Sequence, residues 1–560
     1  MSSTLPPNGP QGPEYLEQGS GSPLEHEVTP KAAGSRKTVL VAVAAVVGLV
    51  LVGGGIWAWT SFLATGPQPA EALPASTLGY ASIDLDPSGA QKIEAVKMLR
   101  KFPAFKDHIG LNTDDDIRKK IFEEILQAGD CKGTSYADDV EPWIGDRAAV
   151  AAVDIGKDQP APVLVVQVKD EAKADKGLSK LQECAVNQDA PPSGGWAIDG
   201  EWAVIAETDK IAQGVVDDAA KSSLADDADY QKWMGEVGDA GIVNLYAAPA
   251  AGRFLADNLG GMGFPFASGY SGSCSASSDG PQTCVEESGT SSMVPSGTTD
   301  ALKDFKGMAA TIRFDNGAVE LEVAGDPGMG AKALYDTDRG DDVLATLPDD
   351  TAAAIGVGFD EGWFTEMVDR MAAYSGGEMS ADEMMGELAN SSGLDLPGDA
   401  ETLAGESVAL SLGGDFDPEK LVNSSDGSDV PIAAKVKGDP DAIDAVLDKV
   451  RGRLGPGAGT FLETTNEGDM VAIGPNPDYR SQVVGQGTLG DSSVFQDVVR
   501  EAQRASAILF VNFDAGDGWL ADLAGGDQTI KANLEPLGGL GISAWQEDDA
   551  AHAVLRLTTN

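Results

Sequence analysis

The sequence predicts an α+β fold: a duplicated ectodomain in which each copy is a mostly antiparallel sheet packed with helices, preceded by one transmembrane helix. Three observations support this prediction. Short segments alternate apolar with polar residues, a pattern typical of half-buried strands, and helical segments lie between them. The same order of segments occurs twice along the chain. An uncharged apolar run precedes both copies.

The uncharged run covers residues 39–63, and about 20 apolar residues are enough to cross a bilayer. We therefore predict a transmembrane helix at residues 38–64. Basic residues precede the run and aromatic residues lie at its far end, which predicts a cytoplasmic N-terminus and an extracytoplasmic C-terminal ectodomain of a single-pass cell-membrane protein. The flanking residues are Lys31, Arg36, Lys37, Trp57 and Trp59.

A cleaved signal peptide is the alternative interpretation of this run, because Ala70-Glu71-Ala72 has the A-x-A pattern of a cleavage site. Two features favour a retained helix instead. The chain before the run is longer than an ordinary n-region, and the run itself is longer than a usual h-region. A lipid anchor is excluded because no cysteine lies near the run.

Composition limits the class of protein. Residues 1–37 are rich in Pro, Gly, Ser and Glu, which predicts a disordered cytoplasmic tail, and residues 65–72 are a predicted linker. The formal net charge is −50, from 89 Asp and Glu against 39 Lys and Arg. Such a surface repels phosphate backbones and anionic lipid headgroups. A nucleic-acid partner is therefore excluded.

The duplication places the first copy at residues 73–330 and the second at residues 340–560. Each copy opens with Leu-Pro, an apolar strand and a helix. The closest match comes late, where LADDADYQKWMGEVGDAGIVNLYAAP in the first copy parallels LGDSSVFQDVVREAQRASAILFVNFDAG in the second. Each copy closes with a predicted hairpin. Asn316-Gly317 marks the first of these turns, because both residue types favour positive φ.

The copies differ by a Gly- and Ser-rich flexible insertion at about residues 252–299. Long segments of this kind in a compact domain are usually lids or disordered loops. The insertion contains an apolar group formed by Met262, Phe264 and Phe266. One hypothesis is that these residues form a lid over a ligand, and the other is a floppy insert held by a disulfide.

The four cysteines all follow the apolar run, and an exported ectodomain favours disulfides. Four cysteines permit three pairings. A short flexible stretch separates Cys274 from Cys284, and closing a short loop costs little entropy. We therefore favour the pairs Cys274–Cys284 and Cys131–Cys184. A metal site is not predicted, because there is no C-x-x-C pair and histidine is scarce.

The sequence predicts no catalytic residue and no cofactor-binding residue. The sequence contains no G-x-S-x-G, H-E-x-x-H or G-x-x-x-x-G-K-[ST] motif. His108 and His552 are the histidines that follow the apolar run, and both are predicted to lie on the surface. Carboxylate pairs are unavoidable among 89 acidic residues and carry no information. We therefore expect a protein that is not an enzyme and binds no cofactor.

Four motifs carry a family resemblance: Leu73-Pro74, Asp84-Leu85-Asp86-Pro87-Ser88-Gly89, Phe102-Pro103-Ala104-Phe105 and Trp143-Ile144-Gly145-Asp146. With these motifs, the chain from about residue 70 to residue 560 resembles an uncharacterised family of actinobacterial single-pass membrane proteins. The shared region of that family is known only as a domain of unknown function. The resemblance implies a membrane location, and it supplies no substrate, cofactor or active-site residue.

Three functional hypotheses follow from the sequence. The leading one is a membrane-anchored, non-enzymatic protein of the cell envelope that binds an envelope protein or scaffolds an assembly. The first alternative is a carrier or sensor of a lipid or another apolar ligand, and the second is a hydrolase that uses carboxylates. A large exposed apolar patch on a well-packed core would favour the first hypothesis, whereas an apolar cavity would favour the carrier.

Overall fold

The computed structural model describes residues 68–560 with gaps, and every statement below concerns the described residues. The gaps are residues 85–89, 109–115, 129–130, 132, 186–193, 240, 259–295, 330–336, 375–378, 418–419, 421–423, 425, 456–458, 517–518 and 520–526.

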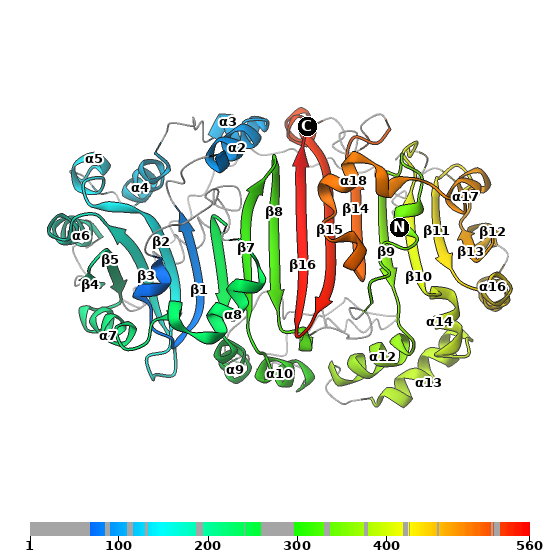
Figure 1. Ribbon diagram of the computed structural model, residues 1–560, viewed down its shortest axis with the longest axis horizontal. Coiled ribbons are helices and arrows are strands. Elements are labelled where there is room, and N and C mark those ends of the chain that lie inside the picture. Colours follow the sequence, from blue (N-terminus) through cyan, green and yellow to red (C-terminus); the bar gives the residue numbers. More distant parts are fainter. Residues whose placement is uncertain are drawn as a thin grey trace, which may run out of the picture.

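The strands of the described chain form one sheet of 16 strands, in the order β12-β13-β11-β10-β9-β14-β15-β16-β8-β7-β6-β1-β2-β3-β5-β4 (Figure 1). The first copy contributes β1 (Thr77–Asp84), β2 (Ile144–Val153), β3 (Ala161–Val168), β4 (Gly195–Asp199), β5 (Trp202–Ala206), β6 (Val243–Ala247), β7 (Met308–Asp315) and β8 (Ala318–Gly325). The second copy contributes β9 (Ala353–Gly358), β10 (Ser407–Leu412), β11 (Ile432–Lys437), β12 (Thr464–Glu467), β13 (Met470–Ile473), β14 (Ala507–Asn512), β15 (Leu537–Glu547) and β16 (Ala550–Thr559).

The two copies contribute their eight strands in the same order, β4-β5-β3-β2-β1-β6-β7-β8 and β12-β13-β11-β10-β9-β14-β15-β16. The last strands of the copies, β8 and β16, pair antiparallel in the middle of the sheet. Because equivalent strands pair antiparallel, an approximate two-fold rotation relates the copies. The sequence predicts a separate sheet in each copy, and the structure instead shows one sheet that continues across the junction.

Helices cover both faces of the sheet. The helices of the first copy are α2 (Ala90–Leu99), α3 (Pro103–His108), α4 (Ile117–Ala128), α5 (Tyr136–Asp139), α6 (Glu171–Ala185), α7 (Asp209–Ala219), α8 (Ala228–Glu236), α9 (Pro249–Asn258) and α10 (Ser296–Lys303). Those of the second copy are α12 (Trp363–Tyr374), α13 (Ala381–Ser392), α14 (Gly398–Ala404), α16 (Pro440–Leu454), α17 (Pro477–Val483), α18 (Ser493–Val498) and α20 (Gln528–Leu534).

We call the face packed against α7, α8, α17 and α18 the inner face. The largest cores lie there, one in each copy: Trp233 of α8 belongs to the first, and Phe495 of α18 belongs to the second. These two helices start at equivalent caps, because the side chains of Asp227 and Ser492 accept hydrogen bonds from backbone N–H groups of the first turn. The opposite, outer face is covered by α5 and α6, by α2, and by α16, each over a smaller core.

The hairpins that close the two copies are confirmed. Asp315 pairs with Ala318 across the first turn, in which Asn316 has φ 50° and Gly317 has φ 76°. Positive φ at both central positions suits the right-handed twist of the flanking strands. The second hairpin joins β15 to β16, with Asp548 at φ 50° in its turn.

The fold-class prediction is wrong in its transmembrane helix. Within the described ranges, no helix is long and apolar enough to cross a membrane. The longest, such as α6 and α16 with 15 residues each, span about 22 Å at 1.5 Å per residue and carry charged side chains, whereas a bilayer core is about 30 Å thick. Residues 1–37 and 38–64 lie outside the described residues. Residues 69–72 of the predicted linker form the 3-10 helix η2 (Pro69–Ala72), whose Ala70 is buried in the inner core.

Candidate interaction face

Two rows of aliphatic side chains cross the outer face of five adjacent strands, β10, β9, β14, β15 and β16. Neighbours within each row are directly opposed in the antiparallel register. The first row is Leu410, Ile355, Leu509, Ile542 and Leu555. The second row is Leu412, Ala353, Val511, Leu540 and Leu557. We call these ten residues the apolar face.

The alternation of each strand puts these residues on the outer face, because the intervening residues fill the inner core. In β9, Ala354 and Gly356 point inward, and a Cβ at Gly356 would lie 2.4 Å from the carbonyl oxygen of Gly340. In β15, a Cβ at Gly541 would lie 2.2 Å from the carbonyl oxygen of Val498. The inner side therefore admits only small residues at these positions, and the bulky aliphatic residues point outward.

The end of the apolar face formed by β10 and β9 is the most open to solvent. Ile355 and Leu410, which oppose each other in register, are each 48% exposed. Leu509, Ile542 and Leu555 are half-buried. Five strands at about 4.8 Å spacing make the face about 20 Å wide. Continuous apolar patches of this kind on soluble domains usually mark interaction sites, whereas single exposed aliphatic residues need no explanation.

The first row continues into the first copy, where a helix covers it. Leu555 opposes Leu321 of β8, and the row then passes through Ile312 and Val243. Buried Ala95 and Met98 of α2 pack on this part of the row. On the other side, α16 packs over the neighbouring strands β11 and β13. The apolar face is therefore the part of the outer face that lies between α2 and α16.

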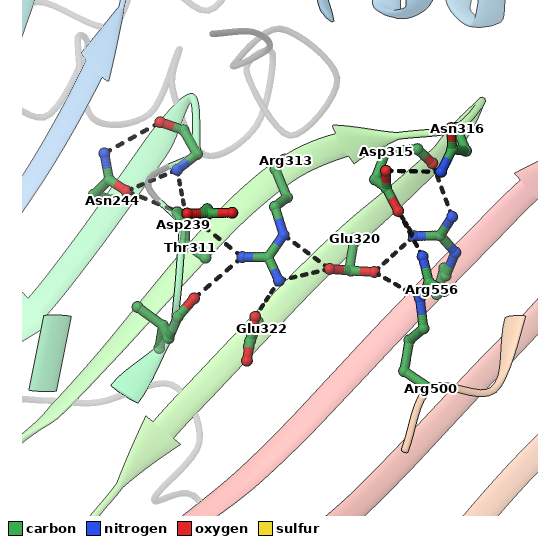
Figure 2. Close-up of polar contacts among 12 residues, drawn as sticks. Asp239, Asn244, Thr311, Arg313, Asp315, Asn316, Glu320, Glu322, Arg500 and Arg556 are labelled. Atoms are coloured by element: carbon green, nitrogen blue, oxygen red, sulfur yellow. Dashed lines mark hydrogen bonds and ion pairs between the residues drawn. The ribbon is translucent and has the colours of Figure 1, made fainter. Parts of the chain in front are cut away.

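Part of the inner face at the junction of the copies carries a network of charged side chains (Figure 2). Arg556 of β16 donates to the Glu320 carboxylate of β8 at 2.6 Å and to Asp315 at 3.0 Å. Arg313 of β7 and Arg500 also pair with Glu320. Burial raises the pKa of Glu320, but the neighbouring arginines outweigh burial and hold this pKa below its ordinary value. This network joins the copies and leaves its charges paired.

His552 corrects a prediction from the sequence. The prediction of a surface residue is wrong, because β16 lies in the middle of the sheet and His552 is 6% exposed. Its ring stacks on Trp545 with 5.1 Å between centroids, and neither ring nitrogen has a hydrogen-bond partner. The Nε2 atom lies 3.7 Å from a carboxylate oxygen of Glu236 of α8. Burial lowers the pKa of His552, although Glu236 and Glu547 act in the opposite direction.

Lys435 of β11 is a buried cation that the sequence did not single out. Its ammonium donates to the carbonyl oxygen of Thr346 at 3.1 Å, to the Thr346 hydroxyl at 2.8 Å and to the carbonyl oxygen of Gly485 at 2.7 Å. Burial lowers the pKa of Lys435 to about 8. The ammonium group makes three hydrogen bonds, one for each of its protons. We therefore assign Lys435 a structural role, in which it holds two loops against the sheet.

The site residues predicted from the sequence lie, apart from Cys131 and the backbone of Cys184, outside the described residues. Cys131 is disulfide-bonded, but the side chain of Cys184 and both Cys274 and Cys284 lie outside the described residues. The proposed pairings therefore stay predictions. The same holds for the membrane-flanking and lid residues, none of which the structure describes: Lys31, Arg36, Lys37, Trp57, Trp59, Met262, Phe264 and Phe266.

Acidic side chains also gather at one edge of the sheet, in an open depression of about 520 Å³ lined by residues that include Asp146, Asp170, Glu171 and Glu201. Lys169 lies 3.5 Å from Asp146 there and offsets part of the negative charge. Within the described part of the chain, no three His, Cys, Asp or Glu side chains are grouped closely enough to hold a metal ion.

Comparison with known proteins places the chain in a family. The family model described as "Protein of unknown function (DUF3352)" matches residues 40–414. The chain belongs to this family. No curated protein and no solved structure matches the chain. The resemblance to a family known only as a domain of unknown function is thus confirmed at that level, and the family description carries no biochemical role.

In this DUF3352 protein, the matched region ends just after β10. It therefore includes the first copy and the strands that carry Ile355 and Leu410. The other strands of the apolar face, β14, β15 and β16, lie beyond residue 414. The apolar face combines strands from inside and outside the matched region, because the fold of the second copy inserts β14 and β15 between β9 and β16.

Proposed function

We propose that this protein is a non-enzymatic binding protein that uses the apolar face to dock a partner in an assembly. The observation that carries the proposal is the opposed pair Ile355 and Leu410, each 48% exposed within two continuous aliphatic rows. Covering such a surface yields about 25 cal/mol per Å² of apolar area removed from water. Hydrophobic cores pack against both faces of the sheet in the second copy. The exposure of the apolar face is therefore not a result of poor packing.

A carrier of an apolar ligand is the alternative use of the same surface. A carrier shields most of the surface of its ligand from water, usually within a concave site. Ile355 and Leu410 lie on an exposed part of the sheet, so a small ligand bound there would keep one side in water. A protein partner covers the face from above and buries both surfaces. The extracytoplasmic location predicted from the sequence stays a prediction, and the binding proposal does not depend on it.

Site-specific photocrosslinking in the source cells tests the proposal. We expect a photoreactive amino acid at position 355 to give one discrete heavier adduct, because a docked partner lies within reach of that side chain. The same reagent at Leu454, which is 62% exposed at the end of α16, is the control and should give none. Equal adduct patterns at both positions, or no adduct at 355, would refute docking on the apolar face.

A further inference from the structure

We propose that the occupant of the apolar face is an amphipathic α-helix of another protein, with one aliphatic stripe and basic flanks. This inference rests on the proposed function and specifies the partner. Its starting point is α2, which shows how this chain covers the same aliphatic row in the first copy. Ala95 and Met98 are buried on Val243 and Phe314, and Leu99 packs beside them.

The spacing of the α2 contacts defines the partner. Positions 95, 98 and 99 are separated by three and four residues, so they form one stripe of a helix. On the apolar face, the corresponding row has Ile355 and Leu410 with no helix of the described chain packed on them in any hydrophobic core. A face about 20 Å wide matches a helix of about 13 residues at 1.5 Å per residue.

Net charge favours a basic helix over two other occupants of the apolar face, a second copy of this chain and an anionic lipid surface. The chain carries a formal charge of −50, so two copies would repel each other on approach, as would an anionic lipid surface. A helix with Lys and Arg beside its aliphatic stripe is instead attracted, and electrostatic steering raises its rate of association. The apolar rows would supply the specificity for an ordered helical stripe, because charge attraction alone does not depend on the order of residues.

A fluorescence anisotropy titration of the full-length protein tests this inference. The probe is a labelled 14-residue peptide with Leu at positions spaced i, i+3, i+4 and i+7 and with Lys and Ala elsewhere. A scrambled peptide of the same composition has the same charge but no stripe. We expect the striped peptide to bind at least tenfold more tightly than the scrambled one. Equal affinity of the two peptides would overturn the proposal.

Neutral substitutions then locate the site. The double variant Ile355→Gln and Leu410→Gln should lose the tenfold preference for the striped peptide, while Leu454→Gln should keep it. Gln is used because it leaves the charge unchanged, and both positions are exposed enough that thermal unfolding should shift little. An unchanged preference in the double variant would overturn the assignment. The assignment would also be overturned if sedimentation equilibrium showed that the wild type is a dimer and the double variant is a monomer.

The two experiments separate the two proposals. A discrete adduct at position 355 in cells, combined with equal binding of striped and scrambled peptides, would keep the docking function and refute the helical occupant. Stripe-selective peptide binding that requires Ile355 and Leu410, combined with no cellular adduct, would support the helical preference of the face and refute its use for docking in those cells.

Discussion

His552 is buried against Trp545 with neither ring nitrogen hydrogen-bonded, so burial favours its neutral form. Its pKa in the folded protein is lowered, whereas a histidine in an unfolded chain titrates near pH 6.5. As the pH falls through this range, the unfolded state takes up a proton first. The free energy of unfolding must therefore decrease toward acid pH through this residue.

We expect the substitution His552→Gln to weaken this pH dependence between pH 7 and pH 5. Absolute stability at pH 7 should also fall, because the ring that stacks on Trp545 is lost. The decisive quantity is the difference in unfolding free energy between the two proteins as a function of pH, measured by urea denaturation. This difference should shrink as the pH falls, and a constant difference would show that His552 does not titrate differently in the folded state.

The same residue shows what sequence patterns leave undetermined. The sequence predicts the closing hairpin whose second strand contains His552, and in the structure His552 and Arg556 share the buried side of that strand. It does not reveal that β8 of the other copy lies beside β16, because that pairing joins segments more than 200 residues apart. The prediction of a surface histidine was wrong for this reason, because the neighbouring strand is not visible in the sequence around His552.

At the scale of elements, local patterns predicted the helices and hairpins well. The strand and helix predicted to open each copy correspond to β1 and α2 in the first copy and to β9 and α12 in the second, and both closing hairpins form as predicted. Capping residues and turn residues act within a few positions, so the sequence displays them directly. The apolar face was not predicted, because its rows combine one residue from each of five strands and depend on register.

Glycines in the strands test how closely the inner layer is packed. Adding a Cβ at Gly356 of β9 would bring it to 2.4 Å from the carbonyl oxygen of Gly340, whereas a Cβ at Gly79 of β1 meets nothing within 4 Å. We expect Gly356→Ala to lower the free energy of unfolding by about 2 kcal/mol, because the backbone must move. Gly79→Ala should be neutral or stabilise by about 0.5 kcal/mol through the unfolded state. Chemical denaturation measures both, and equal effects would contradict the close approach at β9.

At the scale of the whole molecule, the sheet makes the two copies one structural unit. β8 and β16 pair over eight positions, from Ala318 opposite Thr558 to Gly325 opposite Ala551. The charged network around Glu320 adds side-chain contacts across the same junction. The duplicated sequence shows that two similar units exist, but equivalent strands can join in one sheet or remain in two. Side chains at the junction, not the repeat itself, decide between these outcomes.

Substitution of Arg556 tests how much the contacts across the junction contribute to the free energy of unfolding. Its guanidinium is 4% exposed beside a Glu320 side chain that is 5% exposed, so Arg556→Met leaves a buried carboxylate with fewer partners. We expect a loss of about 3 kcal/mol, in the range found when one member of a buried ion pair is removed. Lys232→Met is the control, because Lys232 also links the copies through Asp549, 2.6 Å away, but that carboxylate is largely exposed. Its effect should stay below about 1 kcal/mol.

Calorimetry of the intact chain distinguishes a shared unit from two joined domains. If the copies unfold together, Arg556→Met lowers the temperature of one common transition. Glu320→Leu in the same molecule restores part of it, because the buried carboxylate that lost its Arg556 partner is gone. If the junction is only a contact between independent domains, the variant instead separates the melting curve into two transitions. Two separate transitions would contradict the continuous sheet as the source of cooperativity. They would also mean that the second copy, which carries the apolar face, can unfold while the first copy stays folded.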